Sequence, residues 1–154
     1  MKEHNNFEKN LKNAQKAETK VALILRKNGF KVKSFNDDGK FDIVCETTNG
    51  TRLTFEVKED DRCEDTGNIV IEYESRGRPS GIRTTQADVW VLRAHYEGKA
   101  HNLMYRTENL KQLIRDQKYW DKQQMRHTDS RNRLYFFKFD VLKEHADGVY
   151  YDEF

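Results

Sequence analysis

The sequence predicts an α/β protein with a mixed β-sheet and a helix on at least one face. Two observations support this fold class. Apolar residues recur at spacings of three and four over residues 7–28, which is the period of an amphipathic helix. Several later segments alternate apolar with polar residues or are continuously apolar, as strands are. The order helix, strand, hairpin, strand, short helix, strand is typical of a sheet covered by helices.

Local signals predict where the first helix ends and where the first strand and its turn follow. Gly29 is expected to end the first helix, because glycine readily adopts the left-handed conformation that follows many helices. Residues 30–35 alternate and predict the first strand. The Asn-Asp-Asp-Gly sequence at 36–39 predicts a turn, in which Asp37 and Asp38 serve the turn rather than bind a metal.

A β-hairpin over residues 40–58, KFDIVCETTNGTRLTFEVK, is the central prediction. The Asn-Gly pair between its two alternating runs is a strong hairpin signal. The period of two places Glu56 and Lys58 on one face of the second strand, and Asp42 is expected opposite them. Two carboxylates and an ammonium group at one point suit a divalent metal ion beside a phosphate. The alternative, that these side chains are simply exposed to solvent, stays open from the hairpin alone.

The remaining segments predict further strands and a second helix. A polar, acidic loop is expected at 59–67, and the basic stretch 119–133 is expected to be a helix or a disordered loop. The other expected elements are strands at 69–73, 89–92, 101–105 and 134–139, a helix from its cap Thr107 to about Lys118, and one helical turn after Val141.

Residues 74–85, ESRGRPSGIRTT, have an unusual composition. They include the only proline of the chain, two glycines, three arginines and four hydroxyl side chains. Glycines let backbone amides approach an anion, and arginines and hydroxyls bind phosphate oxygens. The residues expected to bind phosphate are Arg76, Arg78, Ser80 and Arg83. The alternative is an ordinary turn that Thr84 or Thr85 caps before a short helix.

Charge is segregated along the chain. The net charge of the protein is +2, but residues 1–35 carry +6, residues 36–75 carry −8 and residues 76–154 carry +4. This order fits an acidic metal site framed by surfaces that bind phosphate. Solvated charged faces are the alternative reading of the same pattern.

Other classes of protein lack support in the sequence. The 154 residues predict one domain, and no apolar run reaches the length of a membrane span, so a soluble intracellular protein is expected. Cys45 is expected to be buried, and no disulfide with Cys63 is expected. The five histidines show no metal-ligand spacing, and neither a phosphate-binding Gly-Lys-Ser/Thr loop nor a nucleophile elbow is present.

The hairpin resembles the PD-(D/E)xK nuclease superfamily, in which an acidic residue on one strand is followed by acid-x-Lys on the next. Here these residues are Asp42 and the Glu56-Val57-Lys58 triplet, whereas Phe41 replaces the proline of the pattern. The resemblance covers residues 14–95, and the segment from 69 through SRGRPSGI to ADVWVL also resembles small phage nucleases.

Archaeal Holliday-junction resolvases of that superfamily also carry a glutamate on a preceding helix. Glu18 lies 24 positions before Asp42, beside the apolar stripe of the predicted helix. A carboxylate at that position has to be solvated, paired or bound to a metal ion. The resemblance therefore makes Glu18 a further candidate ligand, with an exposed ion pair as the alternative.

The resemblance implies a restriction-endonuclease-like fold and a DNA endonuclease that depends on Mg²⁺ or Mn²⁺. Asp42 and Glu56 would hold the ion together with the Val57 carbonyl, and Glu18 would bind it directly or through water. Lys58 would orient or deprotonate the attacking water, and hydrolysis would leave a 5′-phosphate.

The same resemblance implies DNA as the partner and a nuclease-like domain with its core at about 7–95 and an extension at about 96–154. Resolution of a junction would require a symmetric homodimer with two sites. The first alternative is a nucleic-acid-binding module on the same fold that does not cleave. The second is an interaction protein whose acidic centre binds a basic partner.

Overall fold

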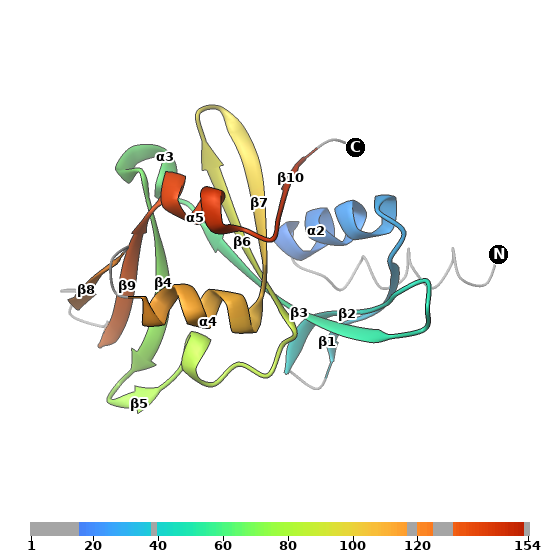
Figure 1. The fold of residues 1–154 in the computed structure, drawn as a ribbon, viewed down its shortest axis with the longest axis horizontal. Helices are drawn as coiled ribbons and strands as arrows, with labels where there is room; N and C mark the ends of the chain where they lie inside the picture. The colour runs from blue at the N-terminus through green and yellow to red at the C-terminus, as the bar shows by residue number, and fades with distance from the viewer. Residues whose placement is uncertain (1–15, 38–39, 117–119, 125–130, 153–154) are drawn as a thin grey trace.

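The computed structural model describes residues 16–37, 40–116, 120–124 and 131–152. These residues form a six-stranded sheet, a four-stranded sheet and the helices that pack on them (Figure 1). The large sheet has the order β1 (Lys31–Asp37), β2 (Phe41–Glu46), β3 (Arg52–Asp60), β6 (Val89–Tyr96), β7 (Lys99–Arg106) and β10 (Gly148–Tyr151). The small sheet has the order β5 (Arg78–Pro79), β4 (Asn68–Ser75), β9 (Asn132–Lys138) and β8 (Trp120–Gln124). The helices are α2 (Lys16–Lys27), α3 (Cys63–Thr66), the 3-10 turn η1 (Gly81–Arg83), α4 (Thr107–Arg115) and α5 (Phe139–His145).

The predicted α/β class and the predicted hairpin are confirmed. Strands β2 and β3 pair antiparallel, with Ile43 opposite Phe55 and Cys45 opposite Leu53. Gly50 has a φ of 81°, the left-handed conformation that its place in the connecting turn requires. Beyond the hairpin, β3 pairs in parallel with β6, so the large sheet is mixed.

The strand predicted at 69–73 lies in the small sheet and not beside the hairpin in the large sheet. It is part of β4, which pairs with β9 in the small sheet. The chain between β3 and β6 therefore leaves the large sheet, contributes a strand to a second layer and returns. Its apolar residues Ile69, Ile71 and Tyr73 are buried between the layers, a pattern that a strand in either sheet would satisfy equally well.

The C-terminal third contains more strand than predicted. Residues 120–124 form β8 rather than a helix or a disordered loop, and the single turn expected after Val141 is the longer helix α5. Strand β10 was not predicted; it pairs with the edge of β7, Val149 lying opposite Leu103. Thr107 is the first residue of α4 rather than its cap, and its hydroxyl donates to the Ala87 carbonyl at 2.6 Å.

Helix α2 covers one face of the large sheet. Its buried residues Val21, Ala22, Ile24 and Leu25 pack in one apolar cluster with residues of four strands: Ile43, Cys45, Phe55, Val91 and Met104. Cys45 is completely buried, as predicted, and burial raises the pKa of its thiol to about 12. Apolar contacts of this kind fix the helix across the β2–β3 hairpin.

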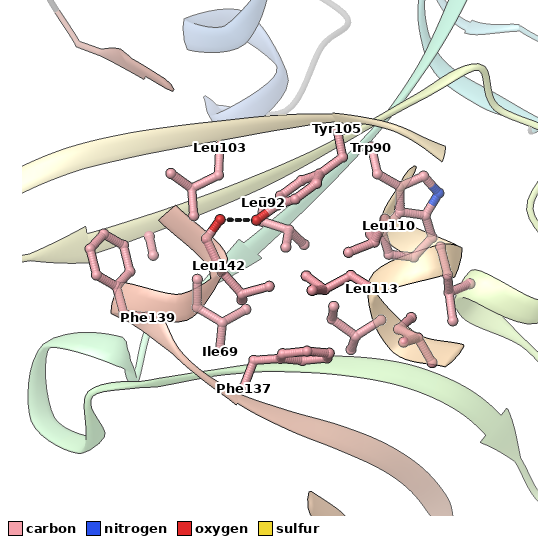
Figure 2. Close-up of a cluster of buried hydrophobic side chains, with 14 of the residues drawn as sticks. Ile69, Trp90, Leu92, Leu103, Tyr105, Leu110, Leu113, Phe137, Phe139 and Leu142 are labelled. Atoms are coloured by element: carbon pink, nitrogen blue, oxygen red, sulfur yellow. Dashed lines mark hydrogen bonds between the residues drawn. The ribbon is translucent and has the colours of Figure 1, made fainter. Parts of the chain in front are cut away.

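The small sheet, α4 and α5 cover the other face of the large sheet. Figure 2 shows the core between these layers, in which residues of β6 and β7 face residues of α4, α5, β4 and β9. The largest buried side chains there include Trp90, Tyr105, Phe137 and Phe139. The Tyr105 hydroxyl donates a hydrogen bond to the Leu142 carbonyl and so joins β7 to α5 (Figure 2).

A buried polar cluster lies on the side of the large sheet that α2 covers. The Arg93 guanidinium is 1% exposed and makes two hydrogen bonds of 2.6 Å to the Asp152 carboxylate. It also donates to the Asn102 side chain at 3.0 Å and to the Glu59 carboxylate at 3.0 Å. Lys20 of α2 lies 3.9 Å from Asp152. The cluster therefore ties three strands of the large sheet to α2 and to the segment after β10.

None of the helices in the described ranges is long and apolar enough to cross a membrane.

Candidate active site

The hairpin brings Asp42 beside Glu56. The paired residues of β2 and β3 end at Ile43 opposite Phe55, and Asp42 and Glu56 are the next residues along the two strands. There the Asp42 carboxylate accepts a hydrogen bond of 2.8 Å from the Val57 backbone N–H. The Asp42 side chain thus accepts the hydrogen bond that a backbone carbonyl of β2 would accept in a regular strand pair. This bond holds the Asp42 carboxylate next to the Glu56 side chain at the point where the two strands separate.

Lys58 completes the predicted set. Its ammonium group lies 3.2 Å from a Glu56 carboxylate oxygen and 5.8 Å from the centre of the Trp90 ring of β6. Glu56 and Lys58 are two positions apart on β3, so both project from the same face. The ion pair and the cation–π contact together hold the Lys58 ammonium beside the carboxylates.

The electrostatics of this group favour a bound cation. Burial raises the pKa of Glu56, the negative charge of Asp42 raises it further, and Lys58 opposes both effects. The raised pKa means that Lys58 does not offset the combined effects of burial and of the neighbouring Asp42 carboxylate. A divalent cation between Asp42 and Glu56 would stabilise both in their charged forms.

The donor set fits magnesium better than a metal that needs many protein ligands. Among the described residues, no three histidine, cysteine or acidic side chains come together as metal ligands. Mg²⁺ keeps several waters and typically binds one or two carboxylates together with substrate phosphate oxygens. The Asp42–Glu56 pair can supply the protein part of that coordination, whereas zinc in a structural site needs four protein ligands.

A cavity of about 340 Å³ opens beside these residues. It is lined by Lys40, Glu56, Lys58, Glu72, Gly81, Thr84, Thr85 and Gln86. The segment that follows β5 therefore approaches β3 from the small sheet and closes one side of the cavity. A second cavity of about 280 Å³ shares Lys58 and Glu72 with the first and extends over Trp90 and Leu92.

Glu72 is a cavity residue that the sequence did not predict. Its carboxylate accepts a hydrogen bond of 3.0 Å from the Ser80 hydroxyl, so Ser80 orients Glu72. Burial alternates along β4, where Ile69, Ile71 and Tyr73 are buried and Glu72 and Glu74 are not, although the pairing with β9 shifts register between Glu72 and Glu74. A period of two therefore places Glu72 on the face opposite Ile71 and Tyr73, but it does not predict that the segment after β5 would meet Glu72 there.

The arginines of the predicted phosphate loop lie in the turn after β4, in β5 and in η1. Arg76 and Gly77 form the turn between β4 and β5, both with positive φ, and Arg78 follows as an exposed residue of β5. The Arg83 guanidinium lies 4.0 Å from Glu74. None of these three arginines lines the cavity beside Glu56. Their role in phosphate binding stays a prediction.

Glu18 is not brought into the same cavity. It is 6% exposed and lies on α2, the helix that packs on the Ile43 and Phe55 face of the large sheet. Because side chains alternate along a strand, Glu56 and Lys58 project from the opposite face. Glu18 lines neither of the two cavities beside Lys58. Its role as a ligand stays a prediction.

The chain matches no protein-family model, no curated protein and no solved structure. Its function therefore has to be inferred from the residues of the site.

Glu56→Gln is expected to raise the melting temperature of the metal-free protein at about pH 7. Because the folded-state pKa of Glu56 is raised, its protonated form stabilises the fold below the usual value of 4.5, and this stabilisation is lost as the pH rises through the raised pKa. Glutamine stays uncharged at both pH values, so the variant should keep this stabilisation at about pH 7. Thermal unfolding in EDTA at about pH 4 and about pH 7 measures the difference between variant and parent. A variant no more stable than the parent at the higher pH would contradict the electrostatic account.

Gly81→Ala is expected to destabilise the fold by about 2 kcal/mol or more. Gly81 has a φ of +55°, and a Cβ atom there would overlap the backbone carbonyl of Glu72. Gly77→Ala is the matched control, because its φ is +77° and nothing lies within 4 Å of its Cβ position. The control should show only the backbone penalty, about 1 kcal/mol. Urea denaturation measures the free energy of unfolding of both variants. Equal losses of stability in Gly81→Ala and Gly77→Ala would mean that the close approach of Gly81 to the Glu72 carbonyl is unimportant.

Proposed function

We propose that this protein is a Mg²⁺-dependent DNA endonuclease with a restriction-endonuclease-like fold. The observation that carries the proposal is the placement of Asp42, Glu56 and Lys58. The Asp42 carboxylate is bound by the backbone N–H next to Glu56 and acts electrostatically on the Glu56 carboxylate, and the lysine ammonium lies 3.2 Å from Glu56. These are the residues on which the resemblance to PD-(D/E)xK nucleases rests. Their convergence favours that resemblance over a chance occurrence of the motif.

The topology also supports the proposal. Helix α2 is followed by three antiparallel strands, and the chain then crosses over to β6, which runs parallel to β3. This is the order of helix, strand, hairpin and returning strand that the motif implies. The crossover contains β4 and the Ser80–Gln86 segment, so it delivers a wall of the cavity as well as the parallel strand.

Each residue of the site has a role in this proposal. Asp42 and Glu56 would hold Mg²⁺ or Mn²⁺, which when bound supplies positive charge beside the scissile phosphate. The backbone at Val57, whose N–H already orients Asp42, offers its carbonyl as a further oxygen. Lys58 would orient the attacking water and balance negative charge that develops on the phosphate. Attack of that water on phosphorus breaks one P–O bond and leaves a 5′-phosphate and a 3′-hydroxyl.

The cavity provides further contacts for a phosphodiester. The cavity is lined, together with Glu56, by the hydroxyl-bearing residues Thr84 and Thr85 and by the cationic Lys40. Hydroxyls and ammonium groups are ordinary donors to phosphate oxygens. The Thr85 hydroxyl also accepts a hydrogen bond of 3.0 Å from the Trp90 indole, which fixes this wall of the cavity to β6. The substrate backbone would therefore lie between β3 and the segment after β5.

The decisive experiment is a cleavage panel of duplex, single-stranded and four-way-junction DNA, each with Mg²⁺ and with EDTA. We expect cleavage of at least one substrate, dependent on the metal ion and leaving 5′-phosphate ends. Tight binding of DNA with no cleavage in Mg²⁺ or Mn²⁺ would instead favour the non-cleaving binding module. If the protein neither binds nor cleaves any of these DNA substrates, both the nuclease and the binding-module assignments are overturned.

A further inference from the structure

Five arginines from two distant segments come together at one end of the small sheet. The pairing of β4 with β9 places Ser75 opposite Asn132, and the Arg76 N–H donates to the Arg131 carbonyl at 3.2 Å. The hairpin turn and β5 then continue from this end of β4, below the rest of the sheet in Figure 1. The residues of this surface, called the arginine end below, are Arg76, Arg78, Arg83, Arg131 and Arg133.

The charge of the arginine end is only partly compensated within the protein. Glu74 accepts ion pairs from Arg133 at 3.1 Å and from Arg83 at 4.0 Å. Arg76, Arg78 and Arg131 are exposed and form no ion pair with another residue that the structure describes. Five arginines and one glutamate leave a net charge of +4. Like charges held this close repel one another, so the arrangement favours an extended anion over a single small one.

The arginine end lies at a defined distance from the candidate active site along one strand. Glu72 lines the cavity beside Glu56, and Arg76 follows four positions later in the turn directly after β4. A strand rises about 3.3 Å per residue, so the two residues lie at most about 13 Å apart. Phosphates along one strand of B-DNA are spaced about 3.4 Å apart along the axis, so this distance corresponds to about four nucleotides.

We propose that the arginine end binds the sugar–phosphate backbone of duplex DNA about four nucleotides from the scissile phosphate. Arginine suits this role, because its planar guanidinium binds phosphate oxygens through two parallel hydrogen bonds. Contacts of this kind set affinity and register and carry no base preference. The position relative to the scissile phosphate rests on the proposed nuclease function, whereas the binding surface itself can be tested without cleavage.

The test is a salt titration of binding to a DNA duplex of about 30 base pairs in EDTA, from about 50 to about 200 mM salt. The triple variant Arg76→Ala, Arg78→Ala and Arg131→Ala is compared with the parent. Each lost phosphate contact should lower the slope of log K against log salt by about 0.9, and the triple variant by about 3. Affinity should fall at least about tenfold and equally for unrelated sequences. Arg26→Ala, an exposed arginine on α2, is the control and should leave the slope nearly unchanged.

Several results would overturn the inference. One is an unchanged slope and affinity in the folded triple variant, with folding checked by circular dichroism. Another is an equal loss in the Arg26→Ala control, which would indicate a general effect of net charge. Tighter binding of duplex RNA than of duplex DNA through the same arginines would reassign the surface to RNA.

The predicted register has its own measurement. Duplexes that end about two nucleotides from the cleavage position should lose the contribution of the three arginines, whereas duplexes that extend about six nucleotides should keep it. If no substrate is cleaved, the proposed nuclease function fails while the salt titration still decides the surface. If cleavage occurs and the arginine variants bind and cut like the parent, only the surface assignment fails.

Discussion

Glu56→Gln is expected to lower the rate of Mg²⁺-dependent DNA cleavage about 10²- to 10³-fold. The substitution removes one of the two adjacent carboxylates and the ion pair that holds the Lys58 ammonium at 3.2 Å. Binding of DNA should remain at the parental level or become tighter, because a negative charge beside the phosphate is lost. Asp42→Asn and Lys58→Ala are expected to lose cleavage in the same way.

Single-turnover cleavage together with binding in EDTA separates these effects. Glu46→Gln is the matched control, because Glu46 lies at the other end of the same hairpin, opposite Arg52. It should cleave at the parental rate. Parental cleavage by both Glu56→Gln and Asp42→Asn would place the active site elsewhere. Loss of cleavage in the Glu46 control as well would indicate damage to the hairpin rather than to the site.

Asp152→Ala is expected to destabilise the protein by about 3 kcal/mol at neutral pH. The Arg93 guanidinium is 1% exposed, so removal of its doubly bonded partner would leave a buried charge poorly compensated. Glu59→Ala removes the other carboxylate bound to the same guanidinium, but the Glu59 side chain is 45% exposed. Water can replace much of that contact, so its loss should cost at most about 1 kcal/mol.

Urea denaturation of the two variants provides the comparison, and its pH dependence adds a second readout. Burial alone would raise the pKa of Asp152, but hydrogen bonds from Arg93 and Asn102 and the positive charges nearby hold it below the usual 3.8. The stabilisation by this carboxylate is therefore present above that value and lost as the pH falls through the lowered pKa. The difference in free energy of unfolding between the parent and Asp152→Ala should therefore become smaller at low pH. Equal losses in the two variants at neutral pH would contradict the role of burial.

Local patterns were enough to predict the hairpin and its polar residues. The Asn-Gly turn and the period of two predicted that Asp42 lies beside β3 and that Lys58 lies beside Glu56, because these placements depend on neighbours within one hairpin. The continuous apolar run Val89–Leu92 likewise predicted the buried strand that became β6. Both signals lie within a few residues of the structure that they specify.

Long-range pairing set the limits of prediction. No local signal distinguishes a β4 beside the hairpin from a β4 that pairs with β9, because both would bury Ile69 and Ile71. Glu72 becomes a cavity residue only because the segment after β5 folds back onto β4, where the Ser80 hydroxyl donates to the Glu72 carboxylate. Strand β10 has four residues and is held at its place by the edge of β7 rather than by its own pattern.

The topology of the two sheets also governs how fast the protein can fold. Phe55 and Val89 of the parallel β3–β6 pair are 34 positions apart in the chain, and Ile71 and Tyr135 of the β4–β9 pair are 64 positions apart. Loop closure over such separations costs chain entropy before contacts repay it, so folding should take milliseconds to seconds rather than microseconds. During synthesis β4 cannot pair fully with β9 until residue 138 has left the ribosome. The cavity between Glu56 and Glu72 would therefore assemble late, after most of the chain has been made.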